Sequence, residues 1–150
     1  MKKRFLILAI AIMFVLCPLL TACGDSIIGE WKIAGYSYEF NGEEKTITLE
    51  QADTLVYDEN VTNITDEQFY LNQIYYINDS REHTTFEFRN DKKMIMATNE
   101  YEWSYVGDKV VAVMNETQVS FTKLENGQLR MEFPVGEITI NIMLEKWKLL

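Results

Sequence analysis

The second half of the chain alternates large apolar residues with mostly polar ones at a period of two, the pattern of β-strands that bury one face. The pattern recurs in short segments between Thr84 and Leu144. Their inward-facing residues are expected to be Phe86 and Phe88; Met94 and Met96; Tyr101, Trp103 and Tyr105; Val111 and Val113; Val119 and Phe121; Leu129, Met131 and Phe133; and Ile138, Ile140, Ile142 and Leu144. Asn, Asp and Gly separate neighbouring segments, and connections this short make every neighbouring pair antiparallel.

One more strand is predicted from Trp31 to Phe40, followed by the hairpin-forming pair Asn41-Gly42 and a partner segment from Lys45 to Leu49. A one-sided antiparallel meander hides its apolar face and its edges by closing on itself. We therefore predict an all-β fold, an eight-stranded antiparallel up-and-down barrel with a partly helical insertion between its first and second barrel strands. An open β-sandwich is the alternative.

The predicted insertion runs from Asn41 to His83 and contains two signals for the start of a helix. Thr48 with Gln51, and Thr65 with Gln68, fit the capping box, in which two side chains satisfy backbone N–H groups at a helix start. The insertion is also rich in rings, which suit a pocket mouth, a protein contact or simple packing onto the barrel. These aromatic residues are Tyr57, Phe69, Tyr70, Tyr75 and Tyr76.

The chain begins with three basic residues, followed by an apolar run from Phe5 to Leu20, the layout of an export signal. The four residues Leu20-Thr21-Ala22-Cys23 resemble the lipobox of bacterial lipoproteins. This resemblance implies that the Cys23 thiol receives a diacylglyceryl chain and that the chain is cut just before it. A plain cleaved signal and an uncleaved anchor are the alternatives.

This interpretation divides the chain into a signal peptide at 1–22, a lipidated tether at 23–26 and a barrel domain at 27–150. The domain would be held by palmitate-like acyl chains on the exported side of the cell membrane or outer membrane. Removing the signal moves the formal net charge from −9 to −12, because Lys2, Lys3 and Arg4 leave with it. A surface this acidic repels polyanions, so nucleic acid is not an expected partner.

The sequence Gly29-Glu30-Trp31 matches the G-x-W motif on the first strand of lipocalins, and residues 27–148 resemble the lipocalin-like bacterial lipoproteins. The resemblance implies that Trp31 closes the narrow end of the barrel beneath a basic side chain of the last strand, Lys146 or Lys148. It also implies a small hydrophobic ligand in the cup and a lid formed by the insertion.

The strands are short, about six residues each, so they build a wall only about 15 Å tall. Such a shallow cup is either filled by its own side chains or leaves room for one small apolar ligand; surfaces that act by contact are a third possibility. The candidate ligand-binding residues of the interior are Phe86, Phe88, Met96, Trp103, Tyr105, Phe121, Met131 and Phe133.

Residues for catalysis or metal binding are not evident. His83 has no second histidine beside it, Cys17 leaves with the signal and Cys23 is used for lipid, so no zinc site or disulfide is expected. No phosphate loop or nucleophile elbow occurs, and we expect no enzyme activity, cofactor or metal. We predict a lipid-anchored envelope protein that binds a small hydrophobic molecule or lipid. The alternative is an adaptor or inhibitor that binds another envelope protein through its aromatic insertion.

Overall fold

A computed structural model describes residues 27–147. The predicted signal peptide, the Cys23 lipidation site and Lys148 lie outside these residues. The strands are β1 (Gly29–Phe40), β2 (Glu43–Thr48), β3 (Thr85–Phe88), β4 (Lys93–Met96), β5 (Asn99–Val106), β6 (Lys109–Met114), β7 (Thr117–Lys123), β8 (Leu129–Val135) and β9 (Ile138–Lys146). Each of β3 to β8 pairs antiparallel with the next strand along the chain.

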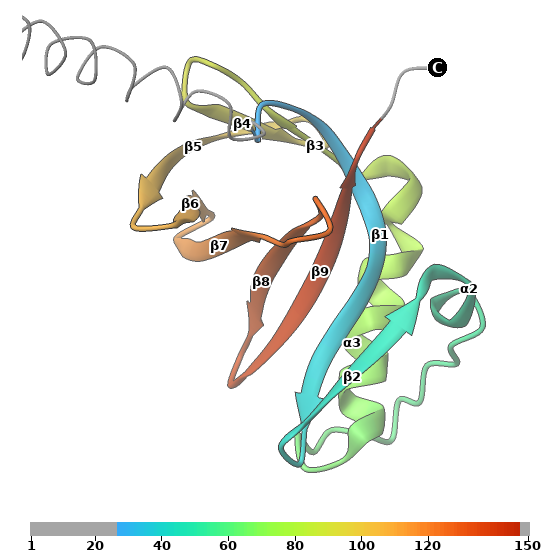
Figure 1. Ribbon diagram of the computed structural model, residues 1–150. Helices are drawn as coiled ribbons and strands as arrows, with labels where there is room; N and C mark the ends of the chain where they lie inside the picture. Colours follow the sequence, from blue (N-terminus) through green and yellow to red (C-terminus); the bar gives the residue numbers. More distant parts are fainter. Residues whose placement is uncertain (1–26, 148–150) are drawn as a thin grey trace, which may run out of the picture.

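Strand β1 closes this meander, because its two edges bond to different strands. On one edge its first residues pair with β3, from Gly29 opposite Phe88 to Lys32 opposite Thr85. The other edge pairs with β9 along most of its length. Strands β1 and β3 to β9 thus form the closed eight-stranded antiparallel barrel that the sequence predicts, and the open sandwich is excluded (Figure 1).

Strand β2 lies outside the barrel wall. It pairs with the second half of β1, with Gly35 opposite Thr48 and Phe40 opposite Glu43. This is the edge of β1 whose first residues pair with β3. Gly35 permits this approach, since a Cβ atom there would lie 3.1 Å from the Ile47 carbonyl oxygen. The sheet therefore extends beyond the barrel and provides a surface on which the insertion packs.

The insertion contains α2 (Leu49–Ala52), α3 (Glu67–Asp79) and the 3-10 turn η1 (Arg81–His83). The capping box of Thr48 and Gln51 is confirmed at the start of α2. The second predicted box is wrong, because Asp66 caps α3 by accepting a bond from the Gln68 backbone N–H. In Figure 1 α3 runs alongside the extended sheet. Within residues 27–147, no helix combines the length and apolar character needed to cross a bilayer.

The predicted alternation is confirmed on most strands, but on β6 it is wrong by one residue. The buried residues there are Val110, Ala112 and Met114, whereas Val113 is 57% exposed. The register explains this, since Val110 pairs with the inward-facing Phe121. Both faces of β6 are apolar in sequence, so alternation alone does not indicate which face is buried.

The turn between β6 and β7 has a backbone conformation that its sequence fits poorly. Asn115 and Glu116 have φ values of 49° and 68°, close to the 53° and 78° of Asn41 and Gly42 in the β1–β2 hairpin. Two consecutive positive φ values define a turn that favours Asn-Gly, and a residue with a Cβ is strained at the second position.

We therefore expect Glu116→Gly to raise the free energy of unfolding by about 1 kcal/mol, because it removes this strain. Gly42→Glu is the matched control and should lower stability by a similar amount. Urea unfolding of both variants measures the effect. A Glu116→Gly variant less stable than the parent protein would contradict the turn geometry.

Candidate functional site

The barrel interior, where the sequence predicts a ligand, is packed with its own side chains. Phe86, Phe88, Phe121 and Met131 are each 1% exposed, and Trp103 is 4% exposed. Side chains that border a cavity large enough for water would keep a larger solvent-accessible area, even if the cavity were enclosed. The Phe88 ring instead packs edge-on against Phe121 and Trp103, with ring centroids 5.1 and 5.9 Å apart. This part of the cup is filled.

The three remaining interior candidates are less enclosed. Met96 and Phe133 are half-buried and pack against the core. The prediction that Tyr105 lies in the interior is wrong, because its side chain is 57% exposed. The pairing of β5 with β4 ends at Glu102, so Tyr105 extends past the neighbouring strand and packs only at the rim, 5.5 Å from the ring of Trp103.

Trp31 lies at the end of the barrel where β1 begins and is 2% exposed. Its indole N–H donates a 2.8 Å hydrogen bond to the Ile27 carbonyl oxygen. Lys146, its partner across the β1–β9 pairing, places Nζ 5.6 Å from the Trp31 ring centroid. Of the two lysines expected to cover this ring, Lys146 does so.

The rings of the insertion divide into two groups. Tyr70 faces the sheet, with centroids 5.3 Å from Tyr38 and 5.6 Å from Phe40, and Phe69 packs beside it. The second group faces outward and, together with a neighbouring valine, forms what we call the insertion patch. The insertion patch consists of Val56, Tyr57, Tyr75 and Tyr76.

The insertion patch exposes much of its area while its rings hold one another in place. Val56 is 76%, Tyr76 54% and Tyr57 39% exposed. The Tyr57 centroid lies 5.0 Å from that of Tyr76 and 5.9 Å from that of Tyr75. A hydrogen bond with Tyr57 also raises the pKa of Tyr76.

Asn72 fastens the loop that carries the insertion patch to helix α3. Its side chain is 2% exposed, accepts a 3.0 Å bond from the Asp58 N–H and donates a 2.8 Å bond to the Asp58 carbonyl. Gln68 adds a 2.9 Å bond to the Val56 carbonyl oxygen. The insertion patch is therefore preformed. Sequence analysis did not single out Asn72, although a polar residue between the apolar positions of a helix is the signal that would have identified it.

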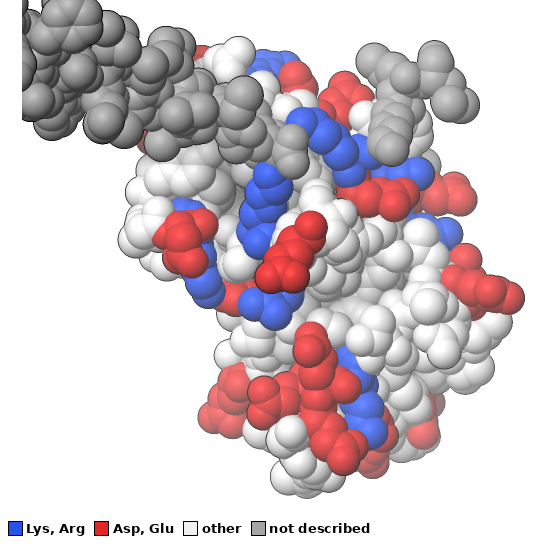
Figure 2. All heavy atoms as spheres, in the orientation of Figure 1, with Lys and Arg blue, Asp and Glu red and all other residues white. Residues whose placement is uncertain are grey.

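The insertion is also strongly acidic. Residues 41–83 contain ten Asp or Glu residues and two Lys or Arg residues. Figure 2 shows acidic side chains gathered at the lower end of the molecule, around the β1–β2 hairpin, while Lys and Arg are more frequent toward the upper end. The negative charge of the domain is thus concentrated on the part that carries the insertion patch.

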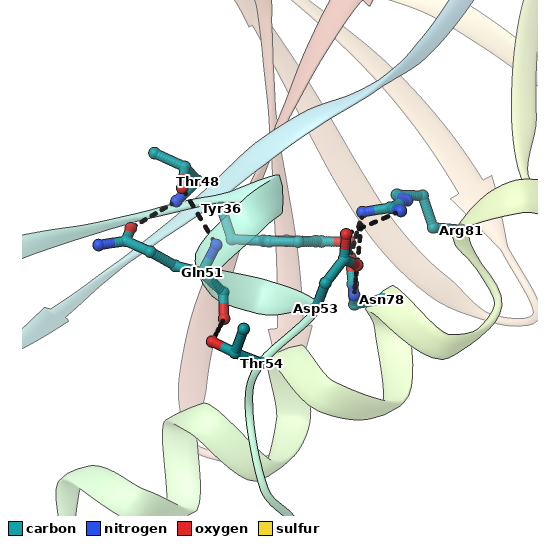
Figure 3. A network of polar contacts seen from close by, with 7 residues as sticks. All are labelled: Tyr36, Thr48, Gln51, Asp53, Thr54, Asn78 and Arg81. Atoms are coloured by element: carbon teal, nitrogen blue, oxygen red, sulfur yellow. Dashed lines mark hydrogen bonds and ion pairs between the residues drawn. The ribbon is translucent and has the colours of Figure 1, made fainter.

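A polar network ties the end of α3 to β1 and α2 (Figure 3). The buried Tyr36 hydroxyl donates to Asn78 Oδ1 at 3.0 Å, and the Asn78 amide donates to Asp53 Oδ1 at 2.9 Å. Arg81 donates to the same Asn78 oxygen at 3.0 Å and forms a 3.0 Å ion pair with Asp53. We call these four residues the insertion latch.

The electrostatics of the insertion latch favour a structural role over proton transfer. Burial raises the pKa of Tyr36 far above its usual value, and the nearby Arg81 charge only partly opposes this, so the hydroxyl remains a hydrogen-bond donor. Hydrogen bonds from Asn78 and Arg81 lower the pKa of Asp53, which keeps its carboxylate ionised. Each group is held in one protonation state and acts as a fixed partner.

Two hollows in the described surface are lined mainly by polar groups. One, of about 410 Å³, lies over the outer faces of β7, β8 and β9 beside Ser120, Arg130 and Glu132. The other, of about 350 Å³, is lined by Asp53, Asn78 and Arg81 of the insertion latch and by the neighbouring Asp79. Within the described residues, no group of three or more His, Cys, Asp or Glu side chains is arranged to hold a metal ion.

No protein-family model, curated protein or solved structure matches the chain. The described residues define its class as an eight-stranded antiparallel barrel with a small helical insertion. Because the interior is packed, the candidate functional features of the described residues are the insertion patch and the surface hollows.

A filled interior predicts that Phe121→Ala lowers the free energy of unfolding by about 3 to 5 kcal/mol, since the truncation leaves a cavity. Val113→Ala, at an exposed position of the adjacent strand, should change it by less than about 0.5 kcal/mol. Chemical denaturation measures both. An almost unchanged stability in Phe121→Ala, combined with loss of a co-purifying small molecule, would instead indicate an open cup.

Tyr36→Phe removes the hydroxyl that joins β1 to the insertion latch and should weaken the docking of α3 by about 1 kcal/mol. Amide hydrogen exchange measures this as faster exchange in α3, with the barrel strands unchanged. The control Tyr105→Phe alters an exposed hydroxyl and should leave exchange in α3 unaffected. Slower or equal exchange of α3 in Tyr36→Phe would show that the hydroxyl does not hold the helix.

Proposed function

We propose that the protein is a lipid-anchored, lipocalin-like protein of the bacterial cell envelope that binds another envelope protein without catalysing a reaction. The observation that carries this proposal is the insertion patch, an exposed and preformed tyrosine cluster on a barrel whose interior is packed. Aromatic side chains are enriched at protein interfaces because they bury a large area at a small cost in conformational entropy.

The surroundings of the insertion patch suggest the chemistry of the partner. The ten acidic residues of the insertion favour a partner with a basic surface. Such charge complementarity speeds association and selects among partners. Tyrosine rings also attract Lys and Arg through their π faces. The proposed partner therefore presents basic side chains around an apolar contact, and it lies close to the membrane because the anchor concentrates the domain there.

A small hydrophobic ligand is the second candidate, and one surface hollow favours it. This hollow, of about 310 Å³, lies where β2 and β3 separate along the edge of β1. The aliphatic side chain of Leu49 and the ring of Trp147 line its apolar part. Lys32, Arg81 and Glu82 also border it, with Lys32 paired to Glu145 and Arg81 to Asp53. This place differs from the barrel interior in which the sequence predicts the ligand.

Replacing Tyr57 and Tyr76 by Ser should weaken the proposed complex, because central tyrosines of an interface each contribute about 2 kcal/mol or about 30-fold in affinity. A photo-crosslinking residue at position 76, incorporated in the native host, should give one adduct of defined mass. The identified partner then allows the affinities of the parent and the double variant to be compared.

Val113 provides the matched control, since it is as exposed as Tyr76 but lies on the barrel wall. A crosslinker at position 113 should give no adduct, and Val113→Ser should bind the partner normally. Unchanged affinity in the double tyrosine variant would refute the insertion patch as the contact. A lipid-sized mass retained in native mass spectrometry, without any partner adduct, would favour the second candidate.

A further inference from the structure

The up-and-down topology brings five segments to the end of the barrel where β1 begins. Because successive strands run in opposite directions, the β3–β4, β5–β6 and β7–β8 connections and the end of β9 all lie there. We call this the anchor end, comprising residues 27–30, 89–92, 105–109, 123–128 and 146–147. In Figure 1 β1 starts and β9 finishes toward the top, whereas the β1–β2 hairpin lies at the bottom.

The anchor end exposes large apolar side chains that the barrel does not need for its core. Val106 is 61%, Tyr105 57% and Trp147 47% exposed. Lysines accompany both rings, with Lys92 Nζ 5.0 Å from the Tyr105 centroid and Lys32 Nζ 5.2 Å from the Trp147 ring. Trp and Tyr beside Lys are typical of the interface between membrane and water, where rings reach the headgroups and ammonium groups face phosphate.

The position of the proposed anchor points to the same end. Cys23 precedes Ile27, the first described residue, by four positions. Four residues span at most about 14 Å, even when fully extended. A barrel held at this distance turns one of its surfaces to the bilayer, and the anchor end is the surface from which the tether leaves.

The distribution of charge also favours the anchor end, rather than the insertion, as the part that faces the membrane. The five segments of the anchor end contain five basic and four acidic residues, whereas residues 41–83 contain two basic and ten acidic residues. Anionic headgroups therefore repel the insertion, whereas they hardly repel the anchor end, because its positive and negative charges nearly balance. The acidic character of the whole protein does not prevent this one end from contacting a lipid surface.

We propose that the anchor end rests on the membrane, with Trp147, Tyr105 and Val106 in the headgroup region. The acyl chains hold the barrel at the bilayer, and these side chains set its orientation. Because α3 packs beside the second half of β1, the insertion patch then lies further from the membrane than the anchor end does. This inference depends on the proposed lipid anchor and not on the proposed protein partner.

The test uses the full-length lipoprotein with its own acyl chains, reconstituted in vesicles of phosphatidylcholine and phosphatidylglycerol. Lipids brominated near the headgroup quench only tryptophans that contact them. Trp31 and Trp103 are 2% and 4% exposed, so Trp147 is the tryptophan expected to respond among the described residues. We expect brominated vesicles to reduce the emission of the parent protein and to leave Trp147→Phe unchanged.

Tyr76→Trp, made in the Trp147→Phe protein, is the matched control, because it places a tryptophan on the exposed insertion patch. Its emission should not respond to bromine. Absence of quenching at Trp147, or equal quenching at positions 147 and 76, would overturn the proposed orientation. Intact-mass analysis of the same sample shows whether the protein carries acyl chains. A protein without them would refute both the proposed anchor and this inference. The crosslinking test of the protein partner does not depend on that result.

Discussion

The structure depends on one strand that bonds to three others. β1 spans twelve residues, pairs with β3 through its first residues, with β2 through its last, and with β9 along the opposite edge. Without it, β3 and β9 would each expose an unpaired edge, which is a site for aggregation. A bulge between Ile33 and Gly35 shifts the alternation of inward- and outward-facing residues along β1. Ile33 pairs with Leu144 and Tyr36 with Ile142, so both are buried although they are three positions apart.

The same strand also connects the barrel to its insertion. Tyr36 donates to Asn78 near the end of α3, and Tyr38 donates to Glu67 at its start with a 2.8 Å bond. The closing strand therefore fixes the position of the helix that bears Tyr75 and Tyr76. Phe88 and Phe121 occupy the interior, whereas the exposed rings of the insertion lie on a surface that β1 positions outside the barrel.

Much of this fold follows from the sequence because period-two alternation and short connections leave few topologies. Capping chemistry predicts α2 correctly at Thr48, but at α3 the adjacent Asp66 competes successfully with Thr65. Where both faces of a strand are apolar, as on β6, the register with a neighbour decides which is buried. The exposure of Tyr105 depends on where the neighbouring strand ends, which no local pattern encodes. The polar residue Asn72 stands out on its helix, but its partner Asp58 lies in a loop that the helix pattern does not indicate.

The most direct test of this account is whether β1 bonds to both neighbours in solution. Nuclear Overhauser contacts between backbone protons report antiparallel pairs, and Trp31 lies opposite both Phe86 on β3 and Lys146 on β9. The closed barrel predicts contacts from the backbone of Trp31 to both residues. Contacts to only one of them, with the other edge exchanging its amide protons rapidly, would contradict closure and require an open sheet.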